Sequence, residues 1–280
     1  MSSPNVPEFA NLSPLVHVIL GLNPSPFTLH GTNTYLIGSG KSKILLDTGQ
    51  GEPSYLPHLK TSLINSNTES ISFILITHHH FDHIGGISQV FEILGKEIPL
   101  YKFHSSESDK KYLPILNNQE FKVEGATLVA IHTPGHAPDH MSFYMPQENA
   151  IFTGDCVLGY GTTVFENLKV YMDSLSVLVD FKPKRLYTGH GPVIEDGLKI
   201  IEGYIMHRNA REQEIFGVLK SGEKSVFEIV EIVYRDYPKE VWPAAENGVE
   251  QHLGKLVEEQ KVAFVDGKYR VNEGVLNFKL

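Results

Sequence analysis

The stretch "ITHHHFDHIGG", residues 76–86, places four histidines and one aspartate within six positions, directly after the apolar run "FILI". In a loop just beyond a buried strand, side chains at positions i and i+2 can converge on one centre while those at i+4 and i+5 serve a second. The four residues with this spacing are His78, His80, Asp82 and His83. The stretch therefore favours two adjacent metal ions over one.

Three further candidate ligands follow at the ends of later predicted strands. They are His136 in "HTPGHAPDH", Asp155 in "FTGDC" and His190 in "YTGHGP". Each is next to a glycine, which lets the backbone approach a crowded centre without a Cβ clash. All three are predicted to be loop ligands.

The overall composition narrows the classes of protein. A chain of 280 residues with 41% hydrophobic and 20% charged residues is typical of one or two globular domains. Its net charge of -9 should repel nucleic acid and anionic membranes unless a local feature reverses the sign. The single cysteine, Cys156, excludes an internal disulfide and fits a reducing compartment. No run approaches the roughly 18 apolar residues of a membrane span, and no cleavable import signal is visible.

Short β-like runs alternate with helical patterns in the first two-thirds of the chain. Helical spacing begins at Ser54, at Ile84 and at Asp173, where the aspartate is expected to cap its helix. Elements mixed in this way predict stacked layers, with sheets inside and helices outside. The predicted strands span residues 15–20, 33–38, 43–49, 71–77, 126–133, 140–145, 150–155 and 185–190.

The pattern changes near Asp196 and divides the chain into 1–195 and 196–280. Three helical patterns follow, the second opening with Ser225 three residues before Glu228, as in a capping box. Asp266-Gly267 then lies between two apolar-rich runs, as in a type I′ hairpin turn. Helices followed by a hairpin predict a winged-helix-like module; the alternative is a general helical cap.

The ordered motifs "LLDTG", "THHHFDH", "TPGH", "TGD" and "GHG" resemble those of the metallo-β-lactamase superfamily, over residues 15 to about 210. The resemblance implies an α/β fold, an αββα sandwich with a dinuclear metal site, usually zinc, at one edge. It also implies that Asp47 shapes the site without ligating. Its implied ligands are His78, His80 and His136 for one ion, Asp82, His83 and His190 for the other, and Asp155 as the bridge.

Several neighbouring residues are expected to have supporting roles. His79 should point away from the metals, because its two neighbours converge on them. Cys156 follows Asp155 in a predicted extended segment, where successive side chains take opposite faces, so it is not expected to be a ligand. His132 and His140 are expected to be hydrogen-bonded scaffold, and a role behind the ligands is open for either.

The implied chemistry is hydrolysis. Two zinc ions can share a water and lower its pKa towards about 7, which supplies a hydroxide nucleophile. Asp82 would orient this nucleophile and later take up a proton. Two ions bring four positive charges, and Asp82, Asp155 and the hydroxide cancel three, so an anionic substrate could bind despite the acidic chain.

Finer resemblance addresses the substrate. "NPSPFTLHGTNTYLIGSG", "GTTVFENLKVYMDSL" and "HRNAREQ" resemble the β-lactamase-like protein 2 family, which includes a mitochondrial endoribonuclease acting on single-stranded RNA. This implies an intracellular endoribonuclease, in the mitochondrial matrix or the cytoplasm. Fungal polyketide thioesterases share much of the pattern, so an acyl thioester is the alternative substrate, and glyoxalase II is a weaker match. The full ligand set argues against a non-catalytic binding module.

The second half offers two candidate substrate residues. His207 and Arg211 are one helical turn apart and could reach a phosphate or a thioester carrier, although an ordinary interdomain hydrogen bond is the alternative. Acidic residues outnumber basic ones from Ile200 onward, so no broad phosphate-binding stripe is expected. We expect the C-terminal module to form a wall of the substrate cleft. The sequence does not indicate an oligomeric state.

Overall fold

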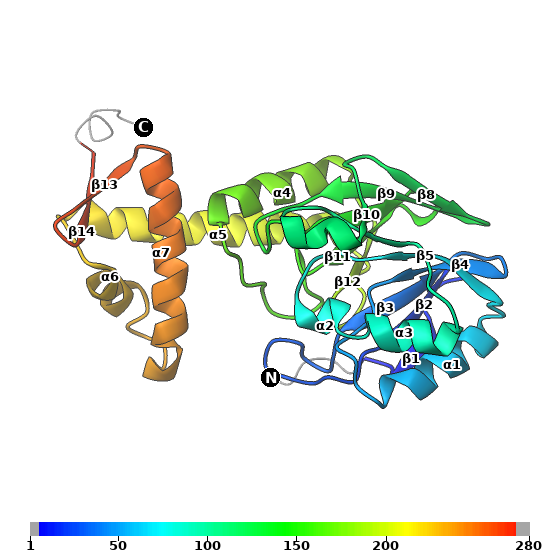
Figure 1. Cartoon of the computed structure of the whole chain (residues 1–280). Helices are drawn as coiled ribbons and strands as arrows, with labels where there is room; N and C mark the ends of the chain where they lie inside the picture. Colours follow the sequence, from blue (N-terminus) through cyan, green and yellow to red (C-terminus); the bar gives the residue numbers. More distant parts are fainter. Residues whose placement is uncertain (1–5, 273–280) are drawn as a thin grey trace.

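Two β-sheets packed face to face form the centre of the molecule in the computed structural model, which describes residues 6–272 (Figure 1). The first sheet has seven strands in sequence order, and the second has five in the order β12-β11-β10-β9-β8. The strands of the first sheet are β1 (Phe9–Asn11), β2 (Val16–Leu20), β3 (Asn33–Ile37), β4 (Ser42–Leu46), β5 (Ser70–Leu75), β6 (Leu100–Lys102) and β7 (Leu113–Pro114). Those of the second are β8 (Glu120–Val123), β9 (Ala126–His132), β10 (Met141–Met145), β11 (Ala150–Gly154) and β12 (Arg185–Thr188).

The hydrophobic core lies between the two sheets. Val18, Tyr35 and Leu46 from the first sheet pack against Phe143 and Phe152 from the second. The rings of Tyr35 and Phe152 meet edge to face, with centroids 5.2 Å apart. β2, β3 and β4 are almost entirely buried, and each contains three consecutive apolar residues, as expected for strands covered on both faces.

Helices cover both outer faces of the sandwich. On the first sheet, Ile19 and Leu45 pack against Tyr55 of α1 (Tyr55–Asn65) and Val90 of α3 (Ile87–Leu94). On the second sheet, strand side chains pack against α4 (Leu168–Asp180) and the start of α5 (Gly197–Leu219). The predicted αββα order of layers is confirmed.

The strand predictions agree with the structure for the interior of the sheets. All eight predicted runs contain a strand, but β1, β6, β7 and β8 were not predicted. These four strands have only two to four residues each, and all of them end a sheet or lie next to its end. A strand that short carries too little alternation to be distinguished from a loop.

The helix expected to be capped by Asp173 begins earlier. Asn167 is its N-cap, with its side chain accepting a hydrogen bond from the backbone N–H of Val170, 3.0 Å away. Asp173 lies inside the helix, exposed, and pairs with Lys169 one turn before it. The prediction was wrong because the apolar stripe extends back to Leu168, which makes Asn167 the cap.

The helical pattern from Ile84 is interrupted. A short helix, α2 (Phe81–Ile84), precedes α3, and Gly85 and Gly86 lie between them. A Cβ at either glycine would collide with the backbone of Gln50 or Thr48. The two glycines therefore let α2, which carries Asp82 and His83, pack directly against the loop that follows β4.

The C-terminal residues form a separate winged-helix module, as predicted. It comprises the end of α5, α6 (Val226–Val233), α7 (Trp242–Glu258) and the hairpin β13 (Val262–Val265) and β14 (Lys268–Val271), which share a core of their own. Asp266 and Gly267 both have positive φ, 51° and 81°, as a type I′ turn requires. The capping box between Ser225 and Glu228 is present.

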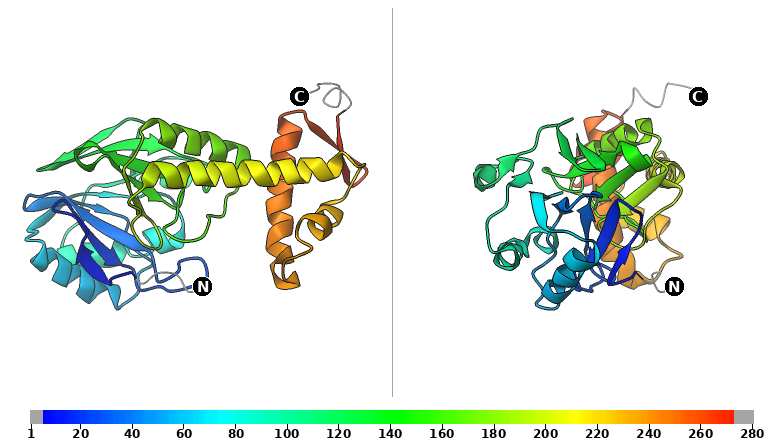
Figure 2. Two further views of the ribbon diagram at one scale, coloured as in Figure 1. Left: turned by 180° about the vertical axis from the view of Figure 1, so that it is seen from behind. Right: turned by 90° about the vertical axis from the view of Figure 1, so that its right-hand side faces the viewer.

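Helix α5 links the module to the sandwich (Figure 2). With 23 residues, it is about 34 Å long. Short 3₁₀ helices complete the described elements: η1 (Glu107–Lys111), η2 (Pro146–Glu148) and η3 (Lys239–Val241). Within residues 6–272, the helices are all too short or too polar to cross a bilayer.

A buried lysine ties three segments together beside the edge at which β5 and β9 end. The Lys102 ammonium lies 2.5 Å from a carboxylate oxygen of Asp139 and 2.8 Å from one of Asp109. The second oxygen of Asp139 contacts the His79 ring nitrogen Nδ1 at 2.8 Å. Lys102 is 1% exposed and Asp139 is fully buried. This network therefore fixes the backbone that carries His78 and His80.

Replacing Lys102 by Met should destabilise the fold by about 3–5 kcal/mol, because two carboxylates would lose their buried cation. Lys122→Met is the matched control, since Lys122 pairs with Glu120 at an exposed site where such a pair contributes at most about 1 kcal/mol. Urea unfolding of the two variants measures the difference. Similar midpoints for both would contradict the assigned role of Lys102.

Candidate metal centre

Seven predicted ligands, which the sequence distributes over more than 110 positions, converge at one edge of the sandwich. All of them follow the carboxyl ends of strands: β5 and the adjoining α2, β9, β11 and β12. Their ligand atoms form two groups, each spanning less than 4.8 Å. The first group is His78, His80, His136 and Asp155; the second is Asp82, His83 and His190.

The first group has the spacing of a tetrahedral site. His78 Nε2 lies 3.0 Å from His80 Nδ1 and 3.3 Å from His136 Nε2, and the last two atoms are 3.1 Å apart. Ligands about 2.0–2.1 Å from a zinc ion would be separated by about 3.3 Å in a tetrahedron. The three imidazoles thus leave room for a single ion between them.

Hydrogen bonds behind the ligands fix which ring nitrogens face inward. The Thr77 hydroxyl donates to Asp47, so His78 Nδ1, 3.0 Å from that hydroxyl, must donate to it and leaves Nε2 unprotonated. His136 Nδ1 donates to the Val164 carbonyl at 2.7 Å, which leaves its own Nε2 unprotonated. Two bare lone pairs then face each other at 3.3 Å. A cation between them would relieve that repulsion.

The second group shares a carboxylate with the first. Asp82 Oδ2 lies 3.2 Å from His83 Nε2 and 3.3 Å from His190 Nε2. Asp155 is near both groups, 3.4 Å from His83 and 3.2 Å from His190 through its two oxygens, and 3.6 Å from His136. His83 Nε2 and Asp155 Oδ1 are buried without a hydrogen-bond partner. Atoms left in this way fit metal coordination.

Asp47 organises the site without joining either group. Its carboxylate accepts hydrogen bonds from the Thr77 backbone N–H and hydroxyl, both at 2.8 Å, and contacts His83 Nδ1 at 2.8 Å. The Asp47 backbone adopts a positive φ of 57°, an unusual conformation for a residue other than glycine. A carboxylate behind a histidine ligand orients the ring and increases its basicity.

The neighbouring residues have supporting positions. His140 Nε2 accepts a hydrogen bond from the Asp155 backbone N–H at 3.1 Å, so this ring holds the segment of a ligand. His79 contacts Asp139, and His132 Nε2 lies 3.1 Å from the Pro138 carbonyl. Burial raises the pKa of the Cys156 thiol to about 12, and Cys156 belongs to neither group of ligand atoms.

The electrostatics of the centre favour a bound cation. Burial lowers the pKa of His78 well below the usual histidine value, and burial with the neighbouring His136 lowers that of His80 to about 4. Burial also lowers the pKa of His190, but the charge of Asp155 and the hydrogen bonds to Asp155 and Asp82 together outweigh burial and raise this pKa to about 9. His78 and His80 therefore offer neutral imidazoles, and the carboxylates attract positive charge to the second group. Both conditions suit metal binding.

Two contributors to the site were missed from the sequence. The Thr32 hydroxyl donates to Asp82 Oδ2 at 2.8 Å, and the Val164 carbonyl accepts from His136. A carbonyl carries no side-chain signal, so Val164 could not have been found. Thr32 lies in "HGTNTYLIG" beside a predicted strand. Its role comes only from the hydrogen bond to Asp82, which is 50 positions away in the sequence.

A pocket of about 470 Å³ opens onto the metal centre. His80, Asp82, His136, Asp155 and His190 form its floor. Its remaining lining comes from two loops, residues 26–29 and 158–166. At its rim Phe27 is 76% exposed and Val164 is 61% exposed. Apolar and aromatic side chains therefore surround a polar floor.

The two candidate substrate residues lie outside this pocket, whose described lining ends at His190. Arg211 pairs with Glu214 at 2.9 Å, and its guanidinium lies 4.4 Å from the centre of the Tyr234 ring in the module. His207, on the same helix, is exposed. The expectation that the module forms a wall of the cleft is therefore wrong for the pocket at the metals, because α5 carries the module away from it (Figure 1).

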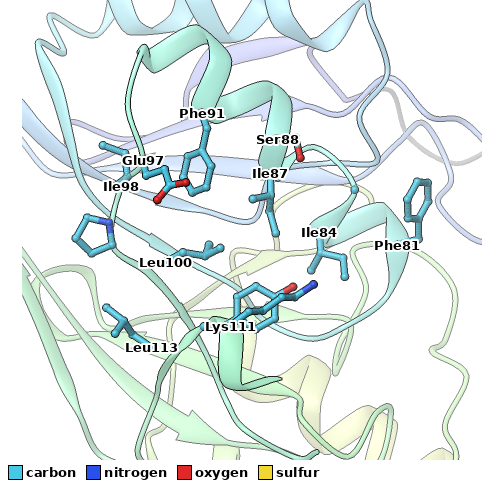
Figure 3. A pocket seen from close by; sticks show the side chains of 13 residues that line it. Phe81, Ile84, Ile87, Ser88, Phe91, Glu97, Ile98, Leu100, Lys111 and Leu113 are labelled. Carbon is cyan, nitrogen blue, oxygen red and sulfur yellow. The ribbon is translucent and has the colours of Figure 1, made fainter. Parts of the chain in front are cut away.

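A second hollow of about 690 Å³ lies between α3 and the strands β6 and β7 (Figure 3). Apolar side chains line most of it, including Ile87 and Phe91 of α3 and Leu100 of β6, with Glu97 and Lys111 as its charged residues. Its described lining contains no residue of either ligand group, although Phe81 and Ile84 of α2 are next to Asp82 and His83 in the sequence. Candidate ligands therefore line the smaller pocket and not this hollow.

Comparisons with known proteins identify the family and confirm the fold. Residues 27–190 match the metallo-β-lactamase superfamily, and residues 225–270 match the β-lactamase-associated winged helix domain. Solved structures show the same fold: a metallo-β-lactamase family protein from Thermus thermophilus (TM-score 0.71, 24% identity, 94% of this chain and 100% of that one) and a β-lactamase domain protein from Burkholderia ambifaria (TM-score 0.78, 18% identity, 94% and 93%).

Similar curated proteins cover nearly the whole chain. The β-lactamase-like protein 2 homologs of Drosophila melanogaster and Caenorhabditis elegans are 43% and 45% identical, over 92% and 90% of this chain and 92% and 87% of their own. The atrochrysone carboxyl ACP thioesterase of Aspergillus chevalieri is 40% identical, over 93% of this chain and 87% of its own. The chain therefore belongs to the metallo-β-lactamase superfamily, in a branch that carries the associated winged helix and includes the β-lactamase-like protein 2 homologs.

Proposed function

We propose that this hydrolase is an endoribonuclease that cleaves single-stranded RNA with two zinc ions. The observation that carries the proposal is the pocket itself, which has exposed rings at its rim above a floor of residues that could hold metal ions. Bases of a single strand stack on exposed aromatic rings, while a phosphate needs positive charge. Phe27 and Tyr160 supply rings at this rim.

In phosphodiester hydrolysis, the residues of the site would have different roles. Two bound zinc ions would lower the pKa of a shared water towards about 7 and stabilise negative charge on the substrate. His78, His80 and His136 would hold one ion, Asp82, His83 and His190 the other, and Asp155 would contact both. Asp82, oriented by the Thr32 hydroxyl, is placed to orient the attacking water and accept its proton.

The winged-helix module gives little support for phosphate binding. Residues 225–270 contain nine acidic and six basic side chains. Proteins that bind the phosphates of the nucleic-acid backbone use basic surfaces, and their affinity for nucleic acid falls steeply as the salt concentration rises. RNA contacts would therefore be concentrated at the pocket, and we expect a shallow salt dependence.

A second candidate function is hydrolysis of acyl thioesters. The similarity to the atrochrysone carboxyl ACP thioesterase, over 93% of this chain, favours it specifically. The same centre could stabilise the oxyanion of a thioester, and the apolar rim could hold an acyl group. The two candidates share the metal centre and differ in what occupies the rim.

Purified protein reconstituted with zinc should hold close to two ions per chain by elemental analysis. Replacing Asp155 by Asn should lower this number, because the amide lacks the negative charge near both groups. Cys156→Ala is the control and should retain both ions, since the thiol is outside both groups. An unchanged metal content in the Asp155 variant would contradict the assigned arrangement.

Labelled single-stranded RNA and an acyl thioester, offered side by side, test the reaction. Zinc-loaded protein should cut the RNA internally, and a chelator should abolish cleavage. Asp82→Ala should also abolish cleavage with little loss of fold, because the Asp82 side chain belongs to none of the hydrophobic cores. Turnover of the thioester with the RNA left intact would overturn the proposal in favour of the second candidate.

Phe27→Ala tests the rim. Loss of one stacked base costs roughly 1–3 kcal/mol, so KM for RNA should rise about 5- to 150-fold with kcat less affected. Phe264→Ala removes another exposed phenylalanine ring, 57% exposed, from the module hairpin and should leave KM unchanged. If both variants behave like the wild type, the rim does not stack the substrate.

A further inference from the structure

The loop that walls the pocket, residues 158–166, is held from both sides. On its inner side, the Val164 carbonyl accepts the hydrogen bond from His136 Nδ1 at 2.7 Å. On its outer side, the adjacent Thr163 carbonyl accepts a hydrogen bond from the Arg208 guanidinium at 3.2 Å. Consecutive carbonyls of one backbone segment are thus bound by a candidate metal ligand and by helix α5.

Arg208 belongs to a row of contacts along α5. Its guanidinium lies 4.7 Å from the centre of the Phe165 ring, which stacks on Tyr171 of α4. One turn earlier, the Tyr204 hydroxyl donates to the Gly161 carbonyl at 2.8 Å and accepts from the Leu158 backbone N–H at 3.3 Å. Tyr204 and Arg208 therefore fix the loop at its start, middle and end.

The same helix reaches both hydrophobic cores. Ile201 and Tyr204 pack in the cluster beside the second sheet, and Ile215 and Leu219 pack in the core of the module. Arg208 lies between these two anchor points. Its position is therefore determined by packing at both ends of α5, which makes it a rigid support for the loop.

We propose that Arg208 is a positioning residue for the metal ligand His136, acting through the carbonyls of Thr163 and Val164. Arg208 holds the peptide that presents the Val164 carbonyl, and this carbonyl keeps the His136 proton on Nδ1 and Nε2 free for metal. The inference rests on the proposed metal centre and is independent of the choice between RNA and thioester.

The test is a zinc-affinity measurement by chelator competition on the full chain. Arg208→Met should weaken the affinity for one of the two zinc ions about 10-fold, the lower end of the range for loss of a metal ligand's own partner, because Arg208 acts on the Val164 carbonyl through the neighbouring peptide. The other ion should be less affected, because Asp82, His83 and His190 have supports elsewhere. Arg208→Lys retains a donor for the Thr163 carbonyl and should recover most of the affinity.

Arg211→Met is the matched control. Like Arg208, Arg211 is an arginine of α5 whose guanidinium lies over an aromatic ring. In this case the ring is Tyr234, which belongs to the module. Zinc affinity should stay at the wild-type value in this variant. Urea unfolding of the zinc-free proteins measures any general loss of stability separately, and the ring Nδ1–H resonance of His136 should shift in Arg208→Met alone.

The outcomes are distinguishable. Wild-type protein that binds no zinc would refute the proposed metal centre itself. Two tightly bound ions in Arg208→Met, or equal weakening of affinity in Arg208→Met and Arg211→Met, would overturn the positioning role. Failure of Arg208→Lys to recover affinity would also count against the hydrogen bond to Thr163 as its cause.

Discussion

The rest of the structure depends on one electrostatic constraint, the crowding of imidazoles and carboxylates at a buried edge. His78 Nε2 and His136 Nε2 face each other at 3.3 Å with no proton available for either to donate. Such an arrangement persists only when the surrounding structure imposes it. Hydrogen bonds on the far side of each ring impose it here, and the resulting free energy cost is offset when a cation binds.

The sandwich is suited to this task because strands from both sheets end at the same edge. β5 and β11 are parallel to neighbours within their own sheets, and each of them is followed directly by a ligand segment. Rigid strand ends bring together residues that are far apart in sequence. The buried Lys102 network then fixes the β5 segment from behind, at a depth where an unpaired charge would be costly.

Much of this could be predicted from the sequence, for identifiable reasons. The ligands are polar residues in unusual density after apolar runs, and the Asp266-Gly267 turn is specified by two adjacent residues. The supports could not be predicted in the same way. Thr32 contacts Asp82 across 50 positions, and the Val164 carbonyl has no side-chain signature. In the "HRNAREQ" motif, helical spacing places His207 and Arg211 on one face but does not indicate the contacts of Arg208, because spacing gives the face of a residue and not the partner that this face meets.

The placement of the module also bears on how a substrate is chosen. The module has more acidic than basic side chains, so its charge does not favour binding of an anionic substrate. None of its described residues lines the pocket at the metal centre. Its mechanical connection is more direct, since α5 packs in the module core at one end and supports the pocket loop at the other. The loop in turn contributes both to the rim and to the orientation of His136. The shape of the rim and the orientation of His136 are therefore coupled through residues 158–166. Substitutions in this loop that admit a new substrate must also keep the Val164 carbonyl in its position beside His136.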